Sequence, residues 1–69
     1  MKYSPRNALT GTIKEIIPGM VNVEVVIDIA PDLEIVSVIT KTSSERLNLA
    51  VGQEVCALVK ASNVMLAVD

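Results

Sequence analysis

The segment VNVEVVIDI, residues 21–29, places the tightest limit on how this chain can fold. Its odd-numbered positions are all β-branched aliphatics, and all but one of its even-numbered positions are polar or charged: Val21, Val23, Val25, Ile27 and Ile29 alternate with Asn22, Glu24, Val26 and Asp28. A period of two residues predicts a β-strand with one face toward a core and the other toward water.

The composition extends this expectation to the whole chain. Hydrophobic residues make up 51% of the 69 residues, and Tyr3 is the only aromatic one. Branched aliphatic side chains pack well on a pleated surface and lose rotamer freedom in helices. An all-β barrel or sandwich is therefore favoured over a helical bundle.

Turn residues divide the chain into five strand-like runs. Pro18 with Gly19, and Pro31 with Asp32, mark turns, and Gly11 within the first run predicts a bend or a close backbone approach. The expected strands cover residues 7–17, 21–29, 33–40, 54–59 and 63–68.

One segment between the third and fourth runs breaks the period of two. In KTSSERLNLAVG, residues 41–52, Thr42 or Ser43 can cap a short helix, Glu45 can close a capping box on Thr42, and Gly52 can end the segment. Three strands, a short helix and two more strands follow the order of the OB-fold. We predict a single domain over residues 1–69, a five-stranded OB-fold-like Greek-key barrel with one short helix between strands 3 and 4.

The small size of the chain predicts association with other copies. A domain of 69 residues buries little apolar area for each residue it orders, so it usually needs a disulfide, a metal or a partner. Cys56 is the only cysteine and there is no histidine, so neither an internal disulfide nor a zinc-type cluster is available. The runs 33–40 and 54–59 are apolar on both faces, which leaves one face of each for a partner.

Charge and residue types argue against several functions. The net charge of -2 gives no basic field for nucleic acid, and the strands carry no aromatic side chains for base stacking. Without histidine, and without a spacing that pairs a nucleophile with a base, we expect no enzyme, no cofactor and no directly ligated metal. No signal-like start and no apolar run of membrane-spanning length are visible, so we expect a cytoplasmic protein that does not bind membranes.

Three short polar segments remain, and all of them offer hydrogen-bond donors without a carboxylate. They are residues 4–7, 40–43 and 60–62, with the sequences SPRN, TKTS and KAS. Hydroxyls, an ammonium and free backbone N–H groups suit a fully ionised oxyanion. Each segment, taken singly, also has a structural interpretation as a turn, a helix cap or a loop.

The motifs together resemble the molbindins, Mop-type molybdate-binding proteins with a single TOBE domain. The resemblance rests on SPRN followed by GTI, on VNVEVVIDI, ITKTS and LNLAVGQEV, and on the final VKASNVMLAVD, and it covers nearly the whole chain. The usual start of the family is Ser-Ala-Arg-Asn, and Pro5 stands here at the alanine position.

This resemblance implies a homohexamer, a trimer of dimers, that holds molybdate or tungstate at subunit interfaces for storage or homeostasis. The first type of site lies between two chains and takes donors from the three polar segments: Ser4, Arg6 through its backbone N–H, Thr40, Ser43, Lys60 through its ammonium, Ala61 and Ser62. A second type lies on the threefold axes, and we place it near the turn formed by Gly19, Met20, Val21 and Asn22.

A donor-only pocket also predicts an order of ligands. Phosphate near neutral pH keeps a proton that needs an acceptor, and leaving it unpaired costs roughly 1–3 kcal/mol. Molybdate and tungstate should compete closely, with sulfate weaker and phosphate weakest. A different kind of function is also open: an OB-type regulatory or scaffolding module that binds a protein partner through its exposed strands. A single-stranded nucleic-acid binder is a weaker alternative.

Overall fold

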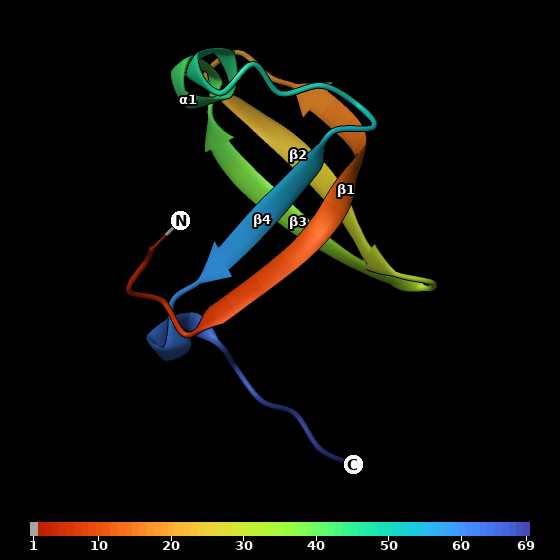
Figure 1. The fold of residues 1–69 in the computed structure, drawn as a ribbon, viewed down its shortest axis with the longest axis vertical. Helices are drawn as coiled ribbons and strands as arrows, with labels where there is room; N and C mark the ends of the chain where they lie inside the picture. Colours follow the sequence, from red (N-terminus) through yellow and green to blue (C-terminus); the bar gives the residue numbers. More distant parts are fainter. Residues whose placement is uncertain (1) are drawn as a thin grey trace.

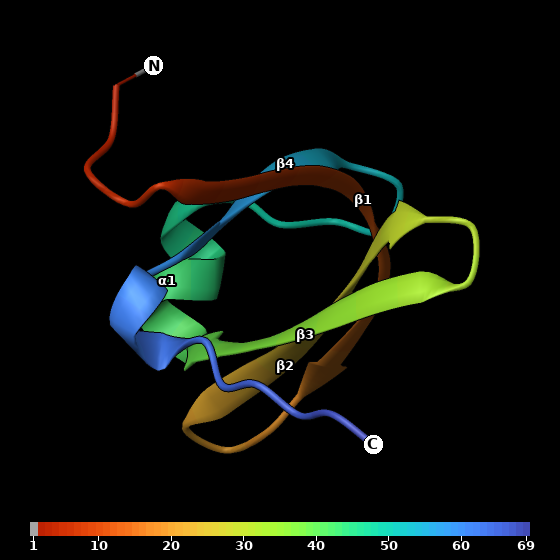
Figure 2. The same cartoon turned by 90° about the horizontal axis from the view of Figure 1, so that it is seen from below.

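Four antiparallel strands form one strongly curved sheet in the computed structural model, which describes residues 2–69. They are β1 (Asn7–Pro18), β2 (Asn22–Ala30), β3 (Leu33–Thr40) and β4 (Glu54–Val59), in the sheet order β3-β2-β1-β4. The sheet curls into a half-barrel with β3 and β4 as its two edges (Figures 1 and 2). Met1, which the predicted single domain includes, lies outside the described residues.

The alternating segment places β2 at the centre of the core, as predicted. Val23, Val25 and Ile27 are at most 5% exposed and pack with Ile13 of β1. Val26 is an exception to the predicted division, because it lies on the opposite face of β2 and is nevertheless buried.

Two local irregularities curve β1. A Cβ at Gly11 would collide with the carbonyl oxygen of Asp28, which confirms the predicted close backbone approach at this glycine. Between Ile13 and Glu15 the register with β2 shifts and leaves Lys14 outside the ladder. A bulge of this kind bends a strand and increases its twist, as the curling of a sheet toward a barrel requires.

A short helix, α1 (Lys41–Arg46), follows β3 directly and covers one end of the half-barrel (Figure 1). The predicted N-cap was wrong: Thr40, and neither Thr42 nor Ser43, caps the helix. Thr40 has extended backbone angles (φ -71°, ψ 151°), so it can be both the last residue of β3 and the N-cap. Among residues 2–69, no helix is long and apolar enough to cross a membrane.

The predicted fifth strand was also wrong for the chain by itself. A 3-10 helix, η1 (Ala61–Asn63), follows β4, and residues 64–69 continue in no regular element. Met65, Leu66 and Val68 are each more than 90% exposed, and the segment leads away from the sheet (Figure 1). A strand needs a neighbour to bond its backbone, whereas the side-chain pattern shows only that a segment is suited to one. The domain is thus a four-stranded open half-barrel rather than a five-stranded barrel.

Candidate functional site

The pairing of β1 with β4 brings two of the three polar segments together. Asn7 pairs with Val59 at the end of this ladder, and the Asn7 side-chain amide donates a hydrogen bond of 3.2 Å to the Val59 carbonyl oxygen. Because the strands are antiparallel, the residues before β1 and those after β4 leave the sheet side by side. Residues 4–6 therefore meet residues 60–62.

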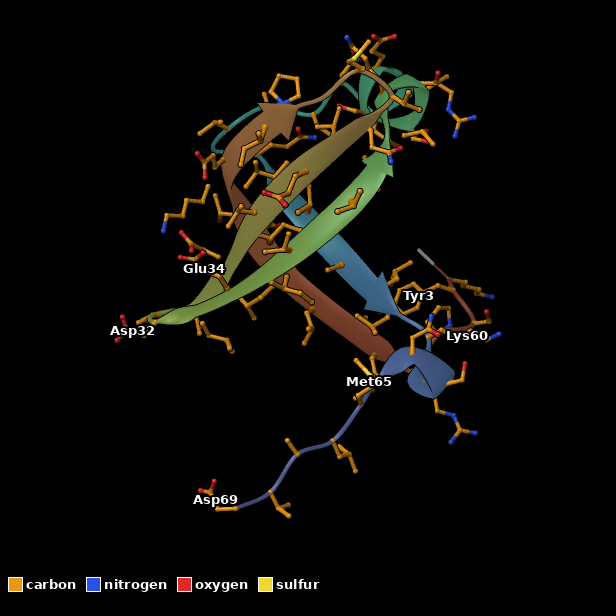
Figure 3. The ribbon with its side chains drawn as sticks, turned by 180° about the vertical axis from the view of Figure 1, so that it is seen from behind. Tyr3, Asp32, Glu34, Lys60, Met65 and Asp69 are labelled. Carbon is orange, nitrogen blue, oxygen red and sulfur yellow. The ribbon has the colours of Figure 1, made fainter. Side chains whose placement is uncertain are left out.

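These two segments enclose an open hollow of about 520 Å³. It is lined by Ser4, Pro5, Arg6, Lys60, Ala61 and Ser62, which include two cationic side chains, two hydroxyls and no carboxylate. Lys60 and Tyr3 lie at this end of the molecule, whereas Asp32 and Glu34 lie far from it (Figure 3). Positive charge and hydroxyl donors in one place favour a small anion. Five of the predicted ligand residues are thus brought together.

Backbone donors add to the side chains on one wall of the hollow. In η1, the Asn63 N–H donates to the Lys60 carbonyl oxygen at 2.9 Å, and the Val64 N–H donates to the Ala61 carbonyl oxygen at 3.2 Å. The N–H groups of Ala61 and Ser62, in the first turn of η1, donate no hydrogen bond within residues 2–69. They remain available to a ligand.

The hollow is open when the chain is alone. Only Pro5 among its lining residues is half-buried, and the others are exposed. Charged groups that face water interact weakly, because solvent screens them. Tight binding at this place requires a second surface that covers the hollow and excludes water.

Thr40 and Ser43, the other two predicted ligand residues of this site, lie at the opposite end of the half-barrel (Figure 1). The Thr40 Oγ1 donates to the Ser43 Oγ at 2.8 Å and accepts from the Ser43 backbone N–H at 3.1 Å. The 12-residue strand β1 runs between the two ends, at a rise of roughly 3.3 Å per residue. A single chain therefore does not bring Thr40 and Ser43 to the hollow.

The turn predicted for the second type of site lies beside Thr40. The Gly19 N–H donates to the Asn22 carbonyl oxygen at 2.8 Å, and the Lys41 N–H donates to the Val21 carbonyl oxygen at 2.8 Å. Asn22 pairs with Thr40 in the β2–β3 ladder, which sets the turn at the α1 end of the sheet. Met20 is 96% exposed at the tip of the turn. Sequence spacing carried no signal of this proximity, because it depends on strand register.

One ion pair lies away from both ends. The Lys14 Nζ lies 2.6 Å from the Glu34 Oε1, and this hydrogen bond raises the pKa of Lys14 above its usual value of 10.5. Both side chains are well exposed, so the pair belongs to the solvated outer face of the sheet. Within residues 2–69, no group of three His, Cys, Asp or Glu side chains is placed to hold a metal ion.

The half-barrel and its carboxylate-free hollow define a small all-β domain whose β1–β4 end is suited to an anion. The TOBE domain family matches residues 3–66, and the chain belongs to this family. It is 48% identical over 69 residues to the molybdenum transport protein ModE of Azotobacter vinelandii, covering 100% of this chain but only 26% of that protein.

Two solved structures have nearly the same fold. MopII from Clostridium pasteurianum superposes with a TM-score of 0.91 at 37% identity, covering 97% of this chain and 100% of that one. A molybdate binding protein from Sporomusa ovata superposes with a TM-score of 0.90 at 42% identity, covering 97% and 98%. The resemblance predicted from the sequence motifs is confirmed.

Proposed function

We propose that this chain binds molybdate or tungstate, without converting it chemically, in a storage or homeostatic role. The observation that carries the proposal is the hollow at the β1–β4 end, where Arg6 and Lys60 supply positive charge and no carboxylate of residues 2–69 competes. Two of the similar proteins, a molybdenum transport protein and a molybdate binding protein, support this choice of ligand.

The donors available match what a tetrahedral dianion needs. A hydrogen bond to a charged group contributes about 1.5–3 kcal/mol, and micromolar affinity corresponds to about 8 kcal/mol. The Lys60 ammonium, the Ser62 hydroxyl and the N–H groups of η1 offer donors on one wall, and the Ser4 hydroxyl and the Arg6 N–H offer them on the other. A handful of these contacts is sufficient.

A second copy of the chain covers the hollow in this proposal. Its support lies in apolar surface that one chain leaves exposed: Met65, Leu66 and Val68 on the C-terminal segment, and Val36 and Val38 on β3. A second hollow, of about 260 Å³ and lined mainly by aliphatic side chains of β2, β3, β4 and residues 47–49, also remains open. Burying such surface between copies supplies the stabilisation that a domain of this size lacks.

The assembly is a homohexamer, a trimer of dimers. In the first type of site, Thr40 and Ser43 of a second copy complete the oxyanion shell begun by Ser4, Arg6 and residues 60–62. The second type lies on the threefold axes at the exposed turn of residues 19–22. We place the protein in the cytoplasm, where a reducing environment keeps the free thiol of Cys56 unpaired.

A regulatory or scaffolding module is the second candidate function. Val36 and Val38 are 55% and 61% exposed on the outer face of the edge strand β3, and a protein partner could cover them. Such a module has no use for the cationic hollow.

Calorimetric titration combined with native mass measurement tests the proposal. We expect heat with molybdate and tungstate, less with sulfate and least with phosphate, and a mass of six chains. The ratio of bound anion to chain then counts the sites. No heat with molybdate would favour the scaffolding function, and tight binding by a monomer would remove the sites from the interfaces.

A further inference from the structure

The two walls of the hollow are ordered by different means. The wall of residues 60–62 is held by η1, through the bonds from Asn63 to Lys60 and from Val64 to Ala61. The wall of residues 4–6 lies outside every regular element, and within residues 2–69 no hydrogen bond ties it to the rest of the chain. Its position has to come from another source.

Pro5 is the one residue of this second wall with a restricted backbone. Its ring fixes φ at about -65°, and it pushes the preceding residue, Ser4, toward an extended conformation. Pro5 is also the half-buried member of the wall, whereas Ser4 and Arg6 are exposed on either side of it. Two residues further on, the side-chain bond from Asn7 to Val59 anchors the start of β1.

We propose that Pro5 is a positioning residue for the oxyanion site: it holds the Ser4 hydroxyl and the Arg6 N–H toward the hollow before the anion arrives. This inference rests on the proposed function. Pro5 has no backbone N–H and so donates no hydrogen bond itself. Compared with another residue at this position, it removes one donor but fixes the backbone of the wall. A flexible wall would have to be ordered during binding, which weakens affinity.

The same rigidity acts on selectivity. A preformed wall keeps its spacing when the smaller sulfate enters, so sulfate makes longer contacts than molybdate does. A flexible wall closes around either anion. Pro5 therefore raises the ratio of molybdate to sulfate affinity as well as the affinity itself.

Pro5→Ala and Pro5→Gly together separate the effect of backbone flexibility on binding from the effect of the added N–H donor. Both variants restore the N–H, but glycine is much more flexible than alanine. Converting the known effects of these substitutions on backbone freedom, we expect Pro5→Ala to bind molybdate about threefold more weakly and Pro5→Gly about tenfold more weakly. The molybdate-to-sulfate ratio should fall in the same order. Pro31→Ala, in the turn between β2 and β3, is the matched control and should leave both quantities unchanged.

Calorimetry with molybdate and with sulfate measures both quantities, and native mass with thermal unfolding shows that each variant remains folded and assembled. Binding by both Pro5 variants that is equal to or tighter than that of the unsubstituted chain would overturn the inference and leave the proposed function standing. No binding of molybdate by the unsubstituted chain would overturn both.

Discussion

The two ends of the half-barrel carry the same kinds of polar side chain but use them differently. At the α1 end, Thr40 and Ser43 bond to one another, and Thr40 caps the helix. At the β1–β4 end, the side chains of Ser4, Lys60 and Ser62 make no hydrogen bond within residues 2–69 and line a hollow. A hydroxyl in a polar motif therefore identifies a binding site only where the local structure leaves its donor unused.

The bonding at the α1 end also divides the roles of its two hydroxyls. The Thr40 hydroxyl is bonded both to the Ser43 Oγ and to the Ser43 backbone N–H, whereas the Ser43 hydroxyl is bonded only to Thr40 and so has more capacity left for a ligand. In the assembly that we propose, both hydroxyls belong to the anion site, and we expect Ser43 to contribute more to binding than Thr40. Substitutions of Thr40 and Ser43 can test this difference between the two hydroxyls, and substitutions at the hollow can test the difference between the two ends.

The largest effect is expected at the contact between copies, which in our proposal brings the α1 end of one chain to the hollow of another. Leu66→Asp places a carboxylate on the apolar C-terminal segment. The Leu66 side chain is 92% exposed in one chain and is buried between copies in our proposal. Burying an unpaired charge costs several kcal/mol, so we expect the assembly to dissociate and molybdate binding to be lost. Native mass and calorimetry report both effects.

Asp69→Asn changes a charge on the same segment and should leave assembly and binding intact. A Leu66→Asp variant that remains hexameric with full affinity would mean that this segment does not join the copies.

The next largest effect concerns the hollow itself. Lys60→Ala removes the ammonium and one charge-assisted bond, and its loss should weaken molybdate binding about 10- to 100-fold without changing the native mass. Lys14→Ala, on the outer face of the sheet, is the control cation and should bind normally. Unchanged affinity in Lys60→Ala would remove Lys60 from the site.

A smaller pair of effects separates Thr40 from Ser43. Thr40→Ala removes the N-cap acceptor, so we expect the free energy of unfolding to fall by about 1 kcal/mol, with a smaller loss of affinity than in Ser43→Ala. Ser43→Ala keeps its backbone bond to Thr40 but loses its hydroxyl, so we expect nearly normal stability and an affinity about fivefold weaker. Chemical denaturation and calorimetry measure the two quantities. Normal affinity in Ser43→Ala would show that the α1 end does not reach the anion.

The smallest effect is expected for the exposed pair of Lys14 and Glu34. The hydrogen bond with Glu34 raises the pKa of Lys14, so its stabilisation is present at neutral pH and is lost as the pH rises through that raised pKa. The melting temperature of Lys14→Ala should lie slightly below that of the unsubstituted chain near pH 7, and the two should converge once the pH exceeds the raised pKa of Lys14. A gap that persists there would assign the effect to packing of the lysine stem.

Most of the strand pattern could be predicted from the sequence, because the signals involved are local. The alternation of residues 21–29 gave the buried face of β2, and the turn residues gave the strand boundaries to within one residue. The helix cap was misplaced because Thr40 is both a strand residue and a cap, and a periodicity assigns each residue to one element. The fifth strand failed because an apolar pattern does not show that a neighbouring strand is present to bond its backbone.

The sequence by itself determined the residue types: aliphatic strands, no disulfide or histidine cluster, and donor-rich segments without carboxylates. Only the tertiary structure decided which of these segments meet, because residues 4–6 reach residues 60–62 through the register of β1 with β4, and residues 19–22 reach Thr40 through that of β2 with β3. Register depends on contacts between residues far apart in the chain, and a local pattern of side chains contains no information about them.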